Sequence, residues 1–147
     1  METTFEKWYP CDNLDTMYDV HDVWLGQEGY SFILLSDGQH RKKLEGQRLM
    51  FTWESIVSYQ LSEERYREDL WVSDPKQAWS FWKSTDSSYL NALRERSTLV
   101  PDGAVHWLFV GTNLIADVIA AQPPKVTVIA PNAGIAKAHR KEFEFQG

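Results

Sequence analysis

Short apolar runs alternate with polar turns along most of this chain, a pattern typical of β-strands. Residues 18–25 and 30–35 are rich in aromatic and β-branched residues, and the Gln-Glu-Gly sequence at 27–29 separates them as a turn does. These two runs therefore predict a β-hairpin. The same reasoning predicts further strands over 48–53, 56–60, 79–82, 104–110 and 125–129.

Two short helices are also predicted. Ser62 can cap the first helix, and the acidic residues that follow suit a first helical turn. Glu63 and Arg67 stand four residues apart, in the order that favours an ion pair along a helix. Asp86 or Ser87 can cap the second helix, which carries its apolar residues on one face.

Residues 113–121 fit two interpretations, because their apolar positions suit both a helical stripe and a strand. With either interpretation the elements predict an α+β fold: a mostly antiparallel sheet of five to seven strands with one or two helices packed on one face. We expect one α+β domain over 18–130. A loose N-terminal arm over 1–17 precedes it, and a C-terminal tail over 131–147, expected to be disordered, follows it.

Charge is distributed very unevenly. The first 37 residues hold eight acidic residues and one basic residue, a sum of −7, so the other 110 residues carry +1 of the total −6. Such a segment repels nucleic acid and anionic membranes, and it attracts cationic surfaces. We therefore expect neither nucleic acid nor membrane as a partner, and we expect a basic protein surface instead.

Composition fits one globular domain of 147 residues, with 43% hydrophobic and 24% charged residues. Aromatic residues make up 14% of the chain, which is high, and most of them are expected in the core. A single cysteine, Cys11, gives no internal disulfide, and no apolar run approaches the ~20 residues of a membrane span. The sequence predicts a soluble, cytoplasmic protein.

Catalytic and metal-binding patterns are not found. The chain has no glycine-rich phosphate loop, and four scattered histidines with one cysteine predict no metal site and no cofactor. Ser87 or Ser88, His106 and Asp117 supply the residue types of a nucleophilic triad, but no nucleophile elbow or other local motif supports that triad. No catalytic residue is predicted, and the protein is expected not to be an enzyme.

A series of separated segments is recognisable in this chain: 32–37, Leu49, Phe51, 58–59 with Glu63 or Glu64, 79–81, 86–90, 106–107 and 113–119. Together these segments resemble a group of small, mostly uncharacterised bacterial proteins of the immunity type, which are thought to neutralise toxins used in competition between bacteria. The resemblance extends over about residues 30–128 and implies that the segment matching 113–120 is a strand. It implies no catalytic residue.

The charge pattern and the resemblance lead to one main hypothesis. The protein is a non-enzymatic immunity protein that neutralises a cognate toxin by occluding its cationic active site. Acidic residues would guide association, and aromatic anchors would supply most of the affinity. The predicted partner-binding residues are Asp12, Asp15, Asp19, Asp22, Trp24, Glu28 and Tyr30.

Two alternatives remain open. The first is a small-molecule enzyme or ligand-binding domain with a pocket lined by Trp79, Phe81, Trp82 and Trp107. A deep cavity holding His106 and a carboxylate would favour this alternative, whereas a filled core there would exclude it. The second is an assembly subunit that forms a symmetric dimer through an apolar patch.

Overall fold

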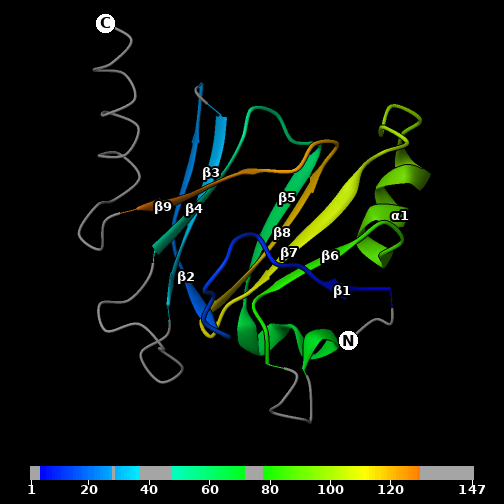
Figure 1. Cartoon of the computed structure of the whole chain (residues 1–147). Helices are drawn as coiled ribbons and strands as arrows, with labels where there is room; N and C mark the ends of the chain where they lie inside the picture. Colours follow the sequence, from blue (N-terminus) through cyan, green and yellow to red (C-terminus); the bar gives the residue numbers. More distant parts are fainter. Residues whose placement is uncertain (1–3, 28, 37–47, 72–77, 130–147) are drawn as a thin grey trace, which may run out of the picture.

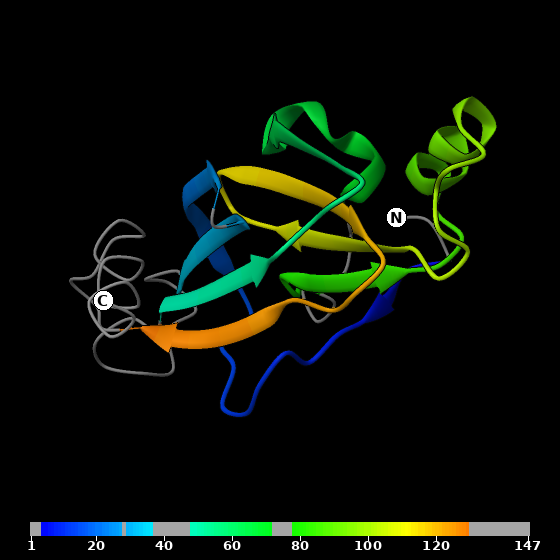
Figure 2. The same cartoon turned by 90° about the horizontal axis from the view of Figure 1, so that it is seen from above.

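The computed structural model describes residues 4–27, 29–36, 48–71 and 78–129. In these residues, two antiparallel sheets pack against each other (Figures 1 and 2). The five-stranded sheet has the order β1 (Glu6–Lys7), β6 (Phe81–Ser84), β7 (Val105–Val110), β8 (Leu114–Ala120), β5 (Ser58–Glu63). The four-stranded sheet has the order β2 (Tyr18–Gly26), β3 (Gly29–Ser36), β4 (Arg48–Trp53), β9 (Lys125–Ile129).

The α+β class is confirmed, but the strands divide between two sheets. One α-helix, α1 (Ser88–Arg96), and two 3-10 turns, η1 (Glu64–Tyr66) and η2 (Glu68–Leu70), complete the described part. Each sheet has an apolar inner face, and stacking the sheets covers both faces at once. In the predicted arrangement, a single sheet would have only one short helix to cover its apolar face. In the observed arrangement, the second sheet covers that face.

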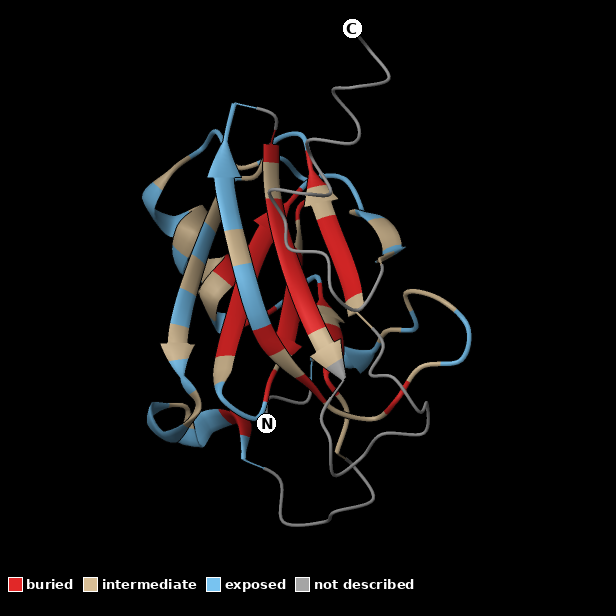
Figure 3. Ribbon diagram, turned by 90° about the vertical axis from the view of Figure 1, so that its left-hand side faces the viewer, coloured by how far each residue is buried: buried red, intermediate tan, exposed pale blue. Residues whose placement is uncertain are grey.

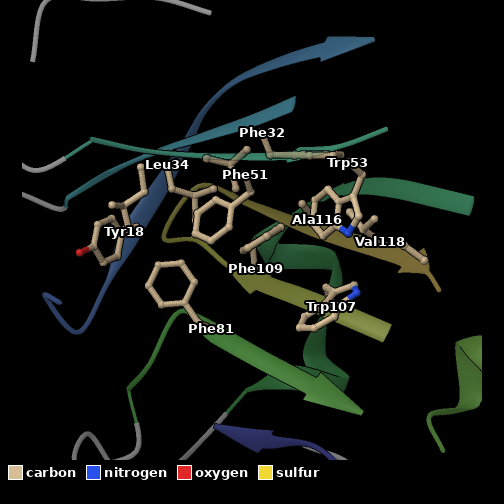
Figure 4. Close-up of a cluster of buried hydrophobic side chains, with 13 residues drawn as sticks. Tyr18, Phe32, Leu34, Phe51, Trp53, Phe81, Trp107, Phe109, Ala116 and Val118 are labelled. Carbon is tan, nitrogen blue, oxygen red and sulfur yellow. The ribbon is translucent and has the colours of Figure 1, made fainter. Parts of the chain in front are cut away.

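The core between the sheets is mainly aromatic (Figure 4). Phe51 from β4 and Phe109 from β7 lie 4.7 Å apart between ring centroids, and both are fully buried. Phe32 joins them from β3 and Phe81 from β6, whereas the central strand β8 contributes Ala116, Val118 and Ala120. This packing accounts for most of the aromatic excess in the sequence.

The predicted hairpin is confirmed as β2 and β3, and Gly29 begins its second strand. Gly29 has φ of +123°, and a Cβ atom there would lie 2.5 Å from the carbonyl oxygen of Trp53. Only glycine fits that conformation and that close approach. A register shift between Val20 and Asp22 places a bulge at His21, so the strict alternation of faces is interrupted there.

The N-terminal segment differs from the predicted loose arm. Strand β1 pairs with β6, and the amide of Trp8 donates to the carbonyl of Phe81 at 2.9 Å. The Trp8 indole packs 4.8 Å from Trp107 and 5.6 Å from Phe51 between ring centroids. The described part of the arm therefore belongs to the domain. The predicted tail, residues 131–147, lies outside the described residues.

The outer face of the five-stranded sheet is partly covered by α1 at one end and by the 3-10 turns at the other (Figure 1). Of the two predicted caps, Asp86 and Ser87, it is Ser87 that caps α1, by accepting a hydrogen bond from the amide of Leu90 at 3.1 Å. The helix predicted after Ser62 is instead the pair η1 and η2. Because a 3-10 turn has three residues per turn, the four-residue spacing is lost, and Glu63 pairs with Arg65 at 2.7 Å rather than with Arg67.

Residues 113–121 adopt the strand alternative, as β8. Ala116, Val118 and Ala120 face the core, so Ile115, Asp117 and Ile119 lie on the outer face. The described helices are too short to cross a membrane.

Candidate functional site

A buried chain of four polar side chains crosses the outer face of the five-stranded sheet. Ser87 caps α1, His106 lies on β7, Asp117 lies on β8, and Arg67 joins η1 to η2. Ser87 Oγ is 2.7 Å from His106 Nδ1, and His106 Nε2 is 2.7 Å from Asp117 Oδ1. Arg67 Nη1 donates to Asp117 Oδ2 at 2.6 Å. We call these four residues the polar chain.

Hydrogen-bond directions in the polar chain follow from Asp117. Its carboxylate only accepts, so His106 Nε2 carries a proton and donates it. In a neutral imidazole, Nδ1 then accepts the hydroxyl proton of Ser87, while Ser87 Oγ accepts the Leu90 amide. Every member of the chain is therefore satisfied without a net charge on the histidine.

Asp117 is held in its charged form although it is fully buried. Burial alone raises the pKa of a carboxyl, but hydrogen bonds from His106 and Arg67 and the positive charge of Arg67 outweigh burial and lower the pKa of Asp117 below its usual range. Gln60 Nε2 donates to the same carboxylate at 3.1 Å. The pKa of Arg67 is raised despite burial by Asp69 and Asp117, so the pair is an ion pair at neutral pH.

The order serine, histidine, carboxylate matches a catalytic triad, yet the serine is not accessible. Ser87 is 1% exposed and His106 is 2% exposed, and the rings of Phe5 and Tyr89 lie 5.0 and 5.3 Å from the imidazole centroid. An acyl-transfer nucleophile needs room for a substrate carbonyl beside its oxygen. In this arrangement the polar chain instead ties α1 and the 3-10 turns to the sheet.

The sequence supplied these residue types without any local motif that supports a triad, and the structure brings Ser87, His106 and Asp117 together. His106 and Asp117 lie on neighbouring strands, where Leu108 pairs with Asp117, so both side chains share the outer face diagonally. Their alternation along β7 and β8 could have indicated this, once residues 113–121 were known to be a strand.

The four aromatic residues predicted to line one pocket lie in two separate places. Phe81 and Trp107 are buried in the core between the sheets, where they pack against other core residues. Trp79 and Trp82 line a separate cavity of about 360 Å³, whereas His106 and Asp117 do not line it. We call this cavity the tryptophan pocket. It is lined by Met17, Glu64, Leu70, Trp71, Ala78, Trp79, Trp82, Val110, Gly111 and Thr112.

Three of the predicted acidic partner-binding residues differ in environment. Asp15 is fully buried, and its amide donates to the Tyr18 hydroxyl at 3.0 Å, so Asp15 cannot contact a partner in this conformation. Asp19 is half-buried and accepts a hydrogen bond from the Thr112 hydroxyl. Asp22 is exposed on β2.

The remaining predicted partner-binding residues also differ in exposure. Asp12 is exposed, and Trp24 is 38% exposed on β2. Tyr30 is half-buried and packs against the main core, which is a structural role. Glu28 lies outside the described residues.

Sequence reasoning missed a second exposed apolar strand. Strand β5 is an edge strand, and its residues alternate between half-buried and exposed (Figure 3). The two edge strands β2 and β5 lie on the same side of the sandwich in Figures 2 and 3. Together they present the edge surface, made up of Leu25 (45% exposed), Val57 (38%), Tyr59 (39%) and Leu61 (42%). Trp24 is not part of it, because it points to the outer face of the four-stranded sheet.

The edge surface continues the core outward. Tyr59 lies 6.5 Å from the buried Phe32 between ring centroids, and Val23, which pairs with Phe32 across the hairpin, is only partly buried. The backbone of β5 is paired with β8 on one side within the described part of the chain, and its other side is an open edge. An open edge can pair with an incoming strand.

Comparisons with protein-family models, with curated proteins and with solved structures found no match for this chain.

Proposed function

We propose that this protein is a non-enzymatic binding protein of the immunity type, which neutralises a cognate bacterial toxin by occluding its cationic active site. The edge surface is the observation that carries the proposal. It joins exposed apolar side chains from β2 and β5 to an open strand edge, with acidic residues beside it. Apolar anchors surrounded by charge are the usual arrangement of a protein-binding surface.

Three acidic residues lie on the strands that carry the edge surface or on the loop that leads into β5. Asp22 lies on β2 between Val23 and the bulge, Glu54 directly follows β4, and Glu63 ends β5. All three are exposed. Exposed acids increase the rate at which a basic partner associates, while Tyr59 and Leu61 would set how slowly it dissociates.

The buried polar chain supports a binding role over a catalytic one. It is the arrangement closest to a known catalytic set in the described residues, and its serine and histidine are occupied in holding α1 to the sheet. The residues exposed on the edge surface are aromatic and aliphatic, which suits contact rather than proton transfer.

The proposal is tested by capturing the partner from the source bacterium and measuring whether this protein inhibits it. We expect one basic protein, retained at low salt, whose toxic activity is abolished at a 1:1 ratio. An Asp12→Asn, Asp22→Asn variant should associate more slowly and with less salt dependence. The matched control is Asp102→Asn, which removes an exposed acid from the turn before β7.

A second pair of variants separates contact from charge. Tyr59→Ala and Leu61→Ala should increase the dissociation rate and leave the salt dependence unchanged. If the acidic and the apolar variants both inhibit the captured protein as well as the wild type does, the edge surface is not the inhibitory surface. If the captured protein has no activity that this protein suppresses, the immunity role is refuted.

The tryptophan pocket favours a second candidate function, that of a small-molecule binding domain. Its volume of about 360 Å³ lies in the range of ligand pockets, and its walls are mainly apolar. Thermal stabilisation by a member of a metabolite panel, lost in Trp82→Ala, would support this function over the immunity role.

A further inference from the structure

The tryptophan pocket lies beside the edge surface, at the end of the sandwich where β5 stops and β2 starts. Glu64 directly follows the last residue of β5, and Met17 directly precedes the first residue of β2. The turn between β7 and β8 supplies Gly111 and Thr112 to the same pocket. A partner lying along β5 would therefore have its next residues over this pocket.

The walls of the pocket are aromatic and aliphatic, and their polar atoms are largely occupied. Trp79 Nε1 donates to the carbonyl of Trp8 at 3.0 Å, and Trp82 Nε1 donates to the carbonyl of Trp79 at 2.6 Å. These bonds fix both indoles and leave ring carbon surface for a ligand. Leu70 and Val110 add aliphatic surface. Such walls suit an alkyl stem and a delocalised cation.

One carboxylate on the pocket wall is not neutralised. Glu64 makes no ion pair with any described residue, whereas Arg65 is paired with Glu63 and Arg67 with Asp69 and Asp117. Residues 63–69 hold four acids and two arginines, a sum of −2. A cation entering the pocket thus finds the available negative charge of Glu64, while both arginines of residues 63–69 are already paired.

Two contacts within the protein show the same chemistry. The Lys7 ammonium lies 5.9 Å from the ring centroid of Trp79, and the Arg65 guanidinium carbon lies 4.8 Å from that of Tyr66. Cations therefore already rest against aromatic rings next to this pocket.

We propose that the tryptophan pocket binds an arginine side chain of the basic partner, with the alkyl stem against Leu70 and Trp82 and the guanidinium beside Glu64. This proposal rests on the proposed function for the origin of the arginine, but the site itself is defined by residues of this chain alone. A volume of about 360 Å³ is near the lower limit for ligand pockets, which suits one long side chain.

The test titrates the full-length protein with N-acetyl-arginine amide and, in parallel, with N-acetyl-citrulline amide, which has the same shape without the charge. Indole N–H signals in ¹H–¹⁵N spectra report binding at each of the seven tryptophans. We expect the arginine amide to shift the signals of Trp71, Trp79 and Trp82. Citrulline amide should bind at least about threefold more weakly, the effect of a partly exposed ion pair.

The variant Glu64→Gln should weaken binding of the arginine amide by about three- to fivefold and leave binding of the citrulline amide unchanged. The matched control is Glu68→Gln, which removes an exposed acid from η2 that does not line the pocket. Equal affinity for the two amides, shifts confined to other tryptophans, or no saturation at any accessible concentration would each overturn the proposal.

These outcomes are independent of the partner experiment. If N-acetyl-arginine amide does not bind in the pocket, the arginine site is refuted, but the proposal of inhibition through the edge surface is unaffected. A pocket that binds it, together with the absence of any inhibited toxin, keeps the cation site and refutes the immunity role.

Discussion

Removing the negative charge of Asp117 should destabilise the fold strongly, because this carboxylate is fully buried and forms an ion pair with Arg67. Asp117→Asn keeps the size of the side chain but replaces one carboxylate oxygen by an NH₂ group. If that group faces His106, the imidazole can reverse its tautomer and accept at Nε2, while the amide oxygen still accepts from Arg67. The main loss is then the charge that compensates Arg67.

The size of that loss follows from burial. Breaking a buried ion pair by removing one partner costs about 3–5 kcal/mol. Arg67 retains Asp69 at 3.1 Å and its side chain is 15% exposed, so water and Asp69 offset part of the cost. We therefore expect Asp117→Asn to lower the free energy of unfolding by about 2–4 kcal/mol.

Urea unfolding followed by tryptophan fluorescence measures this change, because the indoles of the aromatic core report loss of packing. The matched control is Asp69→Asn, which removes the other carboxylate that contacts Arg67. Its side chain is 54% exposed, so we expect a loss below about 1 kcal/mol. Equal losses for the two variants would refute the view that the buried carboxylate holds the polar chain together.

The pH dependence provides a second test with a definite sign. The pKa of Asp117 is lowered in the folded protein, so its contribution is fully present above the ordinary carboxyl value of about 3.9. It is lost as pH falls through the lower folded value. The difference in unfolding free energy between wild type and Asp117→Asn should stay constant from about pH 5 to 7 and shrink below about pH 4.

Three further predictions use the same unfolding assay. Ser87→Ala removes the α1 cap and the partner of His106, and it should cost about 2–3 kcal/mol, whereas Thr98→Ala, at an exposed turn, should change little. Gly29→Ala should lower the free energy of unfolding by about 1–3 kcal/mol, because the φ of Gly29 is +123°. Gly103→Ala, where a Cβ atom would meet open space, should change it by less than about 0.5 kcal/mol. Trp8→Ala should cost about 2–3 kcal/mol, since the half-buried indole packs on Trp107, and the exposed Tyr9→Ala should cost less than about 1 kcal/mol.

Local patterns in the sequence predicted the strands well and their assembly poorly. The hairpin of β2 and β3 was predictable because its register depends on a turn between adjacent runs. The division into two sheets depends on pairs such as β4 with β9 and β5 with β8, which are far apart in the chain. No local periodicity contains that information.

The same limit explains the N-terminal segment. Strand β1 has two residues, too few to show any alternation, so its aromatic neighbours looked like an unstructured arm. Trp8 belongs to the core only because β6 is available to pair with β1. A pairing of that kind becomes visible only in three dimensions.

The candidate surface shows where charge patterns mislead. The acidic N-terminal segment predicted partner-binding residues, but a count of charges does not distinguish the buried Asp15 from the exposed Asp22. Tyr59 and Leu61 alternate with polar residues as in any half-buried strand, so their positions in the sequence do not predict that they lie at the surface. Their exposure arises because β5 is an edge strand.

An exposed apolar edge strand carries a risk of unwanted pairing that a protein with no use for it would be expected to reduce. Strand β5 has no proline or lysine to block an incoming strand, and its acidic residue lies only at its end, Glu63. Tyr59 and Leu61 are each about two-fifths exposed, and Val57 extends the same apolar row. The neighbouring acids disfavour pairing with a second copy of this acidic chain, while a basic partner meets no such repulsion. We therefore propose that the charges around this edge make it selective for a basic partner.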